Sequence, residues 1–159
     1  MENEIKLSKS NELRLKITTD DGRDTGEYLT FDLEDIELPL RYQEMIEKNK
    51  KNVDWLKKEL VIIEKRQDVK GKKLLSKNEE DKIKALNKFF NEEVEIYNMF
   101  LGENGVQKLL NGRKLGWTSL DEISEIIEKQ ILPYFNKKAE EMEQKVIEKY
   151  KVDDKKEVI

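Results

Sequence analysis

Cysteine and histidine are both absent from the 159 residues of this chain. Without a thiol or an imidazole, the sequence offers neither a disulfide framework nor the nucleophile and base of most hydrolases. Only oxygen ligands remain for a metal, and the stretch that best supplies them is TTDDGRDTGEY at 18–28. Counted from Asp20, Thr25 stands where a calcium-binding EF-hand loop requires glycine. Most hydrolase chemistry is therefore excluded, and we expect no metal site and no cofactor.

Long apolar runs are absent as well. No stretch reaches the length of about 18 apolar residues that a membrane-spanning helix needs. The N-terminal stretch, MENEIKLSKSNELRLK, lacks the apolar centre of a secretory signal peptide. We therefore expect a cytoplasmic protein that does not enter a membrane.

Charged side chains make up 42% of the residues, but both signs are mixed and the net charge is only −4. Such a mixture does not predict disorder throughout the chain. Residues 41–75 carry eleven Lys or Arg and six Asp or Glu. Because these charges flank apolar residues, we interpret the basic region as the solvated face of a helix. A nucleic-acid surface is the alternative interpretation, and the acidic net charge argues against it.

An alternation of apolar and polar residues predicts a β-hairpin over residues 11–32. Leu13, Leu15 and Ile17 alternate with polar side chains, which places them on one face of a strand. Turn-forming residues follow at 20–26, and a second apolar group forms the return strand. Because two strands alone are marginal in water, the hairpin must pack on helices or pair with a partner.

Two long helices are predicted next, at about 40–67 and at 77–101, joined by a short linker that makes them antiparallel. The first helix has an apolar seam formed by Leu40, Tyr42, Ile46, Asn49, Val53, Leu56, Leu60 and Ile63. The second helix has a stripe formed by Ile83, Leu86, Phe90, Val94, Tyr97 and Leu101. Ser76 and Glu79 form a capping-box pattern at its start. Asn49 is the one polar member of the seam, where a buried Asn fixes register between copies, so we expect a homo-oligomer.

Four of the seven glycines fall within FLGENGVQKLLNGRKLGW, residues 100–117. Gly102 predicts the end of the second helix, and Gly112 the end of a short helix at 103–111. A second capping-box pattern, Ser119 with Glu122, predicts a last core helix at 119–135.

Two interpretations of this glycine-bounded segment stay open: a corner of the core, or a surface that binds a partner. The candidate partner-binding residues are its apolar side chains, Phe100, Leu101, Val106, Leu109, Leu110 and Trp117. Within this set we expect Leu109 in the core and Val106, Leu110 and Trp117 partly exposed.

Together these elements predict an α+β fold that is mostly α. An N-terminal β-hairpin is followed by a long antiparallel helical hairpin, a short helix and a C-terminal helix, all in a single domain at 1–135. Residues 136–159 continue the helical pattern as a charged C-terminal tail, which either frays or docks on a partner or on another copy.

The order of elements and two segments resemble the tail assembly chaperones of long-tailed phages and prophages of Gram-positive bacteria. The segments are LEDIELPLRY at 33–42 and FLGENGVQKLLNGRK, and the resemblance covers roughly residues 30–135. The matching positions are Phe100, Leu101, Gly102, Glu103, Gly105, Lys108, Leu109, Leu110 and Gly112. The resemblance implies a non-enzymatic protein of the host cytoplasm that binds the tape-measure protein, keeps its long helices soluble and helps to deliver tail-tube protein.

Two alternative functions stay beside this one. The protein is a structural or adaptor subunit of a tail or another assembly, or it is a nucleic-acid-binding regulator that uses residues 41–75. A structural subunit stays in finished particles, whereas a chaperone is absent from them.

Overall fold

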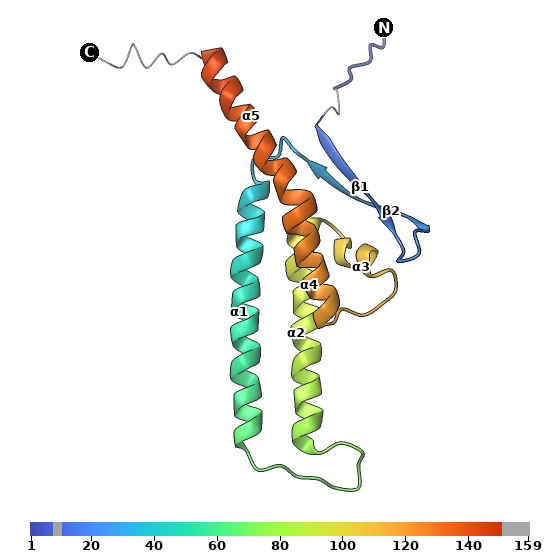
Figure 1. The fold of residues 1–159 in the computed structure, drawn as a ribbon, viewed down its shortest axis with the longest axis vertical. Coiled ribbons are helices and arrows are strands. Elements are labelled where there is room, and N and C mark those ends of the chain that lie inside the picture. The colour runs from blue at the N-terminus through green and yellow to red at the C-terminus, as the bar shows by residue number, and fades with distance from the viewer. Residues whose placement is uncertain (8–10, 151–159) are drawn as a thin grey trace, which may run out of the picture.

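The structure is a computed structural model that describes residues 1–7 and 11–150. It is α+β and mostly helical, with an N-terminal β-hairpin followed by helices (Figure 1), which confirms the predicted fold class. The elements in chain order are β1 (Glu12–Thr18), β2 (Asp24–Asp32), α1 (Leu38–Lys65), α2 (Lys77–Leu101), α3 (Gly105–Leu110), α4 (Trp117–Ile126), the π-helical turn η1 (Ile127–Ile131) and α5 (Leu132–Tyr150). The antiparallel pair α1 and α2 forms the long axis, and α4, η1 and α5 run as one continuous rod beside it (Figure 1).

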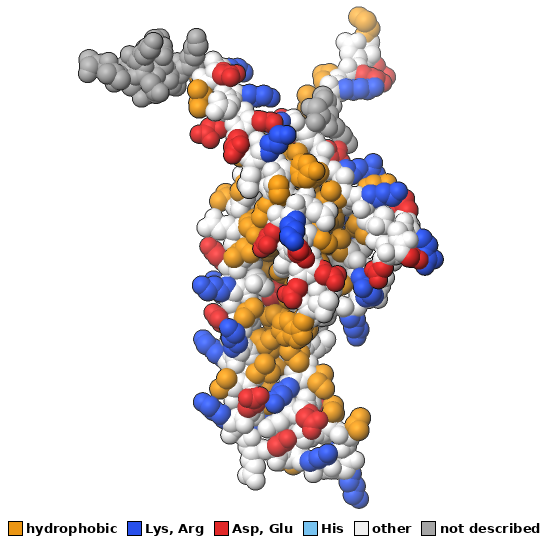
Figure 2. Space-filling view, in the orientation of Figure 1, with side chains coloured by type: hydrophobic (Ala, Val, Ile, Leu, Met, Phe, Trp, Pro, Cys, Tyr) orange, Lys and Arg blue, Asp and Glu red, His pale blue; other side chains and the backbone are white. Residues whose placement is uncertain are grey.

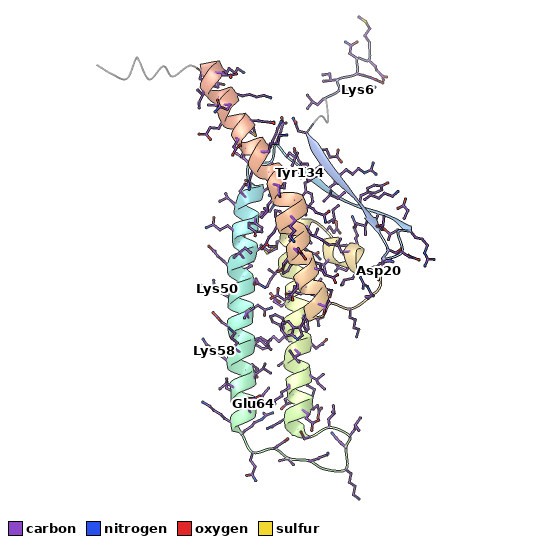
Figure 3. The ribbon with its side chains drawn as sticks, in the orientation of Figure 1. Lys6, Asp20, Lys50, Lys58, Glu64 and Tyr134 are labelled. Atoms are coloured by element: carbon purple, nitrogen blue, oxygen red, sulfur yellow. The ribbon has the colours of Figure 1, made fainter. Side chains whose placement is uncertain are left out.

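The hairpin forms within its predicted range. β1 pairs antiparallel with β2, with Leu13 opposite the buried Phe31. The connecting residues form a plain turn, because the N–H of Thr19 donates to the carbonyl of Arg23 at 2.8 Å. Asp20 lies at the exposed tip of the hairpin (Figure 3).

The two long helices begin with the signals that the sequence carries. Pro39 lies in the first turn of α1, where backbone N–H groups have no acceptor within the helix, so the N–H that proline lacks is not needed there. Ser76 caps α2, since its hydroxyl accepts the N–H of Glu79 at 3.2 Å. These two signals mark where each helix starts.

The seam of α1 differs from the predicted one in its first turns. Leu40 and Ile46 are 64% and 45% exposed, whereas Leu38 and Met45 are buried. Both sets satisfy the helical spacing, so the period alone does not fix the phase of the helix. The buried part of the seam, Leu56 and Ile63, belongs to the core of the same chain, and Asn49 donates a hydrogen bond to Glu93 of α2, so these three side chains are not free to join a second copy.

The C-terminal rod also departs from the prediction. α4 begins at Trp117, and the hydroxyl of Ser119 accepts the N–H of Gly116 at 2.9 Å from inside the first turn. Ser119 therefore does not cap the helix as the residue before it, and the predicted pairing with Glu122 is wrong. The helix then continues past Pro133 to Tyr150, as the helical pattern from residue 136 onward predicts, and residues 151–159 of the predicted tail lie outside the described residues.

Four aromatic side chains join the hairpin to the helices in one core. The ring of Phe100 from α2 lies 5.7 Å from that of Phe31 in β2 and 5.4 Å from that of Tyr42 in α1. Phe135 of α5 completes the cluster at 6.0 Å from Phe31. Because each ring comes from a different element, this cluster fixes how the elements sit on one another.

Candidate functional site

The glycine-bounded segment docks on α2 through a close backbone approach. A Cβ at Gly105 would lie 2.6 Å from the Cβ of Leu101, so only glycine fits there without a shift. Asn98 ties the two helices together: its Oδ1 accepts the N–H of Val106 at 2.8 Å, and its Nδ2 donates to Oε1 of Gln107 at 2.9 Å. α3 is thus held in one orientation against the end of α2.

This orientation decides which of the candidate partner-binding residues are accessible. Four of the six are at most 5% exposed: Phe100, Leu101, Val106 and Leu110. Leu109 is half-buried and Trp117 is 54% exposed. The expectation that Val106 and Leu110 are partly exposed is wrong, because residues 106 and 110 share the helix face that packs toward α2. Leu109, which we expected in the core, packs against it but is only half-buried. The partial exposure of Trp117 is confirmed.

A groove of about 430 Å³ lies between α2 and this segment. Its lining comes from α2, from α3 and from the loop at 111–116: Asn87, Phe90, Asn91, Val94, Glu95, Gln107, Leu110, Arg113, Lys114 and Leu115. We call it the α2–α3 groove. Phe90, Val94 and Leu115 form its apolar wall, and each is only half-buried. The groove therefore leaves apolar surface of three side chains open to solvent.

Trp117 extends this apolar wall toward α4. Its ring centre lies 4.8 Å from that of Phe90 and 5.3 Å from that of Phe89, so one of its faces is covered by aromatic side chains. The other side is open, in keeping with its exposure of about half. Hydrophobic side chains gather over the α1–α2 pair below the start of α4 (Figure 2). A rigid, half-exposed indole of this kind is a typical anchor of a protein interface.

The rim of the α2–α3 groove is polar and carries both signs of charge. Arg113 and Lys114 lie among its lining residues from the loop, and Glu95 from α2. The Nε of Arg113 donates to the carbonyl of Leu110 at 3.2 Å, which holds the guanidinium beside the groove. An apolar wall with a charged rim is the usual anatomy of a surface that binds another protein.

The other side of α2 buries a carboxyl group that the sequence analysis missed. Glu93 is fully buried against α1. Nδ2 of Asn49 donates to both of its oxygens, at 2.9 and 2.8 Å, and Nδ2 of Asn52 donates to Oε1 at 3.1 Å. Burial raises the pKa of Glu93, and the two asparagine side chains act in the opposite direction.

A sequence signal for Glu93 existed but was ambiguous. Glu93 stands four residues after Phe89 and four before Tyr97, both of which are buried, and so falls on the inner face of α2. The sequence shows Asn49 at a seam position, but it does not show that its partner is a carboxyl group of the same chain. Among the described residues, the hydrogen-bond partners of the Glu93 carboxyl group are the side-chain amides of Asn49 and Asn52, and no basic side chain bonds to it.

The basic region of α1 lies outside both features. Lys50 and Lys58 point away from α2 (Figure 3), and both side chains are exposed. This agrees with a solvated helix face, as interpreted from the sequence.

Across residues 1–7 and 11–150, no three His, Cys, Asp or Glu are grouped so that they could hold a metal ion. None of the helices in this described part is both long and apolar enough to cross a membrane. Comparisons of the chain with protein-family models, with curated proteins and with solved structures find no match.

Proposed function

We propose that this protein is a non-enzymatic tail assembly chaperone of a long-tailed phage or prophage of Gram-positive bacteria. In this proposal it binds the tape-measure protein in the host cytoplasm, self-associates, and has the tail-tube protein as a second partner. The resemblance of residues 33–42 and 100–114 to that family supports the proposal. The observation that carries it is the α2–α3 groove with the half-exposed Trp117 beside it.

A chaperone of long amphipathic helices needs an apolar groove with a polar rim. A helix that binds in such a groove inserts apolar anchors from successive turns. The half-buried wall of Phe90, Val94 and Leu115 offers a surface for these anchors, and Trp117 prolongs it. Because Asn98 and Gly105 fix α3 on α2, the groove is preorganised, and binding does not have to order it.

The charges around the groove favour a partner helix with polar residues of both signs beside its apolar stripe. Arg113 and Lys114 suit acidic residues on one flank of such a helix, and Glu95 suits a basic residue. Trp and Arg are also the residue types that contribute most often to interface affinity. Trp117 and Arg113 are therefore expected to contribute to the affinity.

Co-expression with the tape-measure protein of the same phage or prophage tests the proposal. We expect the two proteins to co-purify, and we expect Leu115→Asp to abolish the co-purification because it puts a charge on the apolar wall. Ile62→Asp is the matched control, since Ile62 is 60% exposed on α1 and lies outside the groove. Failure of the wild-type chain to retain the tape-measure protein contradicts the proposal.

The alternative, a structural or adaptor subunit, uses the same groove for a permanent contact. Purified tail particles separate the two functions. A chaperone is absent from finished tails, and a structural subunit is present in a fixed ratio to the other tail proteins.

A further inference from the structure

The distal half of α5 is a helix on which little of the chain packs. Phe135 is buried, but within residues 136–150, the described part of the chain that follows it, only Lys138 and Met142 are half-buried. Val146 and Tyr150 are 57% and 65% exposed. In Figure 1 this part of α5 projects beyond the N-terminal end of α1. A free helix of this length is marginal in water, so its apolar face calls for a partner.

The apolar residues of this half form one stripe. Ala139, Met142, Val146 and Tyr150 are spaced by three or four residues, which places them on the same face of the helix. The stripe begins in a notch of about 240 Å³ that is lined by Leu33, Glu34, Asp35, Ile36, Pro39, Phe135, Ala139 and Met142. Ile36 of this lining is 77% exposed, and Leu40, which follows Pro39 in the chain, is 64% exposed. An apolar helix face and an apolar notch therefore meet at one end of the same chain.

The charges of the two surfaces are complementary. Glu34 lines the notch, and Glu37 follows Ile36 in the same connection between β2 and α1. On α5, Lys145 and Lys149 lie on one flank of the stripe, since they are four residues apart and next to Val146 and Tyr150. One flank of the stripe therefore offers lysines, while Glu143 stands beside the other flank. The notch offers Glu34, which accepts a hydrogen bond from Asn11 of its own chain, and Glu37, which pairs with Arg41 at 3.6 Å, so the lysine-bearing flank is the one that suits the notch.

We propose that two copies of this chain form a symmetric dimer in which the distal half of each α5 packs into the notch of the other copy. In a two-fold symmetric dimer, the helix of each copy occupies the notch of the other, so both surfaces of both chains are used. No surface is left to bind a third copy, and the assembly stops at two chains. The stripe covers Ile36 and Leu40 of the partner copy, and its lysines approach Glu34 and Glu37. This deepens the self-association included in the proposed function, and it does not depend on the tape-measure protein, so the two can fail separately.

Sedimentation equilibrium of the full chain measures the dimer directly. We expect the wild-type mass to be twice the 18.9 kDa of one chain, and Val146→Glu to be monomeric. Ile62→Glu is the matched control and remains dimeric, because Ile62 is exposed on α1 away from this face. Circular dichroism melting of Val146→Glu should retain the melting transition of the core, since Val146 packs on none of it.

Charge reversal tests which surfaces meet. Lys145→Glu with Lys149→Glu should weaken the dimer by roughly tenfold, as should Glu34→Lys with Glu37→Lys, because several exposed ion pairs are reversed each time. All four changes in one chain should restore it, because each copy then carries both reversed surfaces. A wild-type monomer, a dimeric Val146→Glu or the absence of restoration overturns the inference. A monomer whose Val146→Glu variant loses the tape-measure protein instead assigns this face to that partner.

Discussion

The two sides of α2 differ in the kind of side chain that they bury and expose. Toward α1, Glu93 is fully buried, and three N–H···O hydrogen bonds from two asparagines satisfy it. Toward α3 and α4, Trp117 and the wall of the α2–α3 groove leave aromatic and aliphatic surface exposed. A buried polar group with all its partners stabilises one arrangement of the helical hairpin, whereas exposed apolar surface contributes nothing until another molecule covers it. The first side therefore belongs to the fold, and the second side is the candidate for binding.

The largest effect is expected from a charge placed where the groove meets the core. Leu110→Asp should cost roughly 3–5 kcal/mol, because it removes a buried side chain and leaves an unpaired carboxyl in its place. Leu109→Asp should cost clearly less, since Leu109 is only half-buried. Thermal melting by circular dichroism compares them. Equal losses for the two variants would contradict the orientation of α3.

The next effect tests the close approach that holds α3. Gly105→Ala should cost about 1–3 kcal/mol, because the new Cβ collides with Leu101 and separates the helices. Gly116→Ala is the control, since a Cβ there meets nothing within 4 Å and its φ of −137° suits any residue. Denaturant melts measure both variants. A tolerated Gly105→Ala would mean that α3 does not pack on α2 at this distance.

The buried carboxyl makes the hairpin depend on pH. The pKa of Glu93 is raised in the folded protein, so its contribution to stability is full below its unfolded value of 4.5 and is lost as the pH rises through the folded pKa. Glu93→Gln removes this titration and keeps the shape. We expect the free energy of unfolding of the wild-type chain, relative to Glu93→Gln, to fall between pH 4.5 and neutrality.

A control separates Glu93 from the other acids. Arg41 holds the pKa of Asp35 below its usual range, which gives the opposite slope: its contribution is lost as the pH falls. Asp35→Asn should therefore reduce acid sensitivity at the low end of the range. A difference between the wild-type chain and Glu93→Gln that stays constant with pH would show that Glu93 has the same pKa in both states.

The smallest effect concerns the start of α2. Ser76→Ala should cost about 1 kcal/mol, because the N–H of Glu79 loses its acceptor. Ser76 stands at the start of α2, more than ten residues before the part of α2 that carries Glu93 and lines the α2–α3 groove. The substitution should therefore lower stability and leave partner binding intact. Urea melts and a binding titration on the same sample check this.

Local signals gave most of the fold. The alternation from Leu13 to Ile17, the cap at Ser76 and the glycine at 102 locate the hairpin, the start of α2 and its end, because each depends on residues close in sequence. The phase of α1 was not predictable, since Leu40 and Ile46 satisfy the same period as Leu38 and Met45. Which of the two sets is buried depends on how α2 packs against α1.

The candidate site was predictable only in position. The glycines marked residues 100–117, but the burial of Val106 and Leu110 follows from the approach at Gly105, which involves Leu101 and Leu29 from other elements. Phe90 was assigned to the core stripe of α2, and the structure leaves it half-buried in the groove wall. Contacts between segments that are distant in sequence decide which of these apolar side chains are buried, and the periodicity of the sequence does not reveal those contacts.

The most direct test of the groove is one binding titration with one melting curve on Trp117→Ala. The variant removes a half-exposed ring that packs on Phe89 and Phe90, so the loss of stability should be only about 1–2 kcal/mol. If the groove binds the tape-measure protein, the affinity for a helical fragment of that protein should fall by roughly 30-fold or more, as expected for an interface anchor. An affinity equal to that of the wild-type chain, with the melting transition retained, would contradict the assignment of this side of α2 to binding.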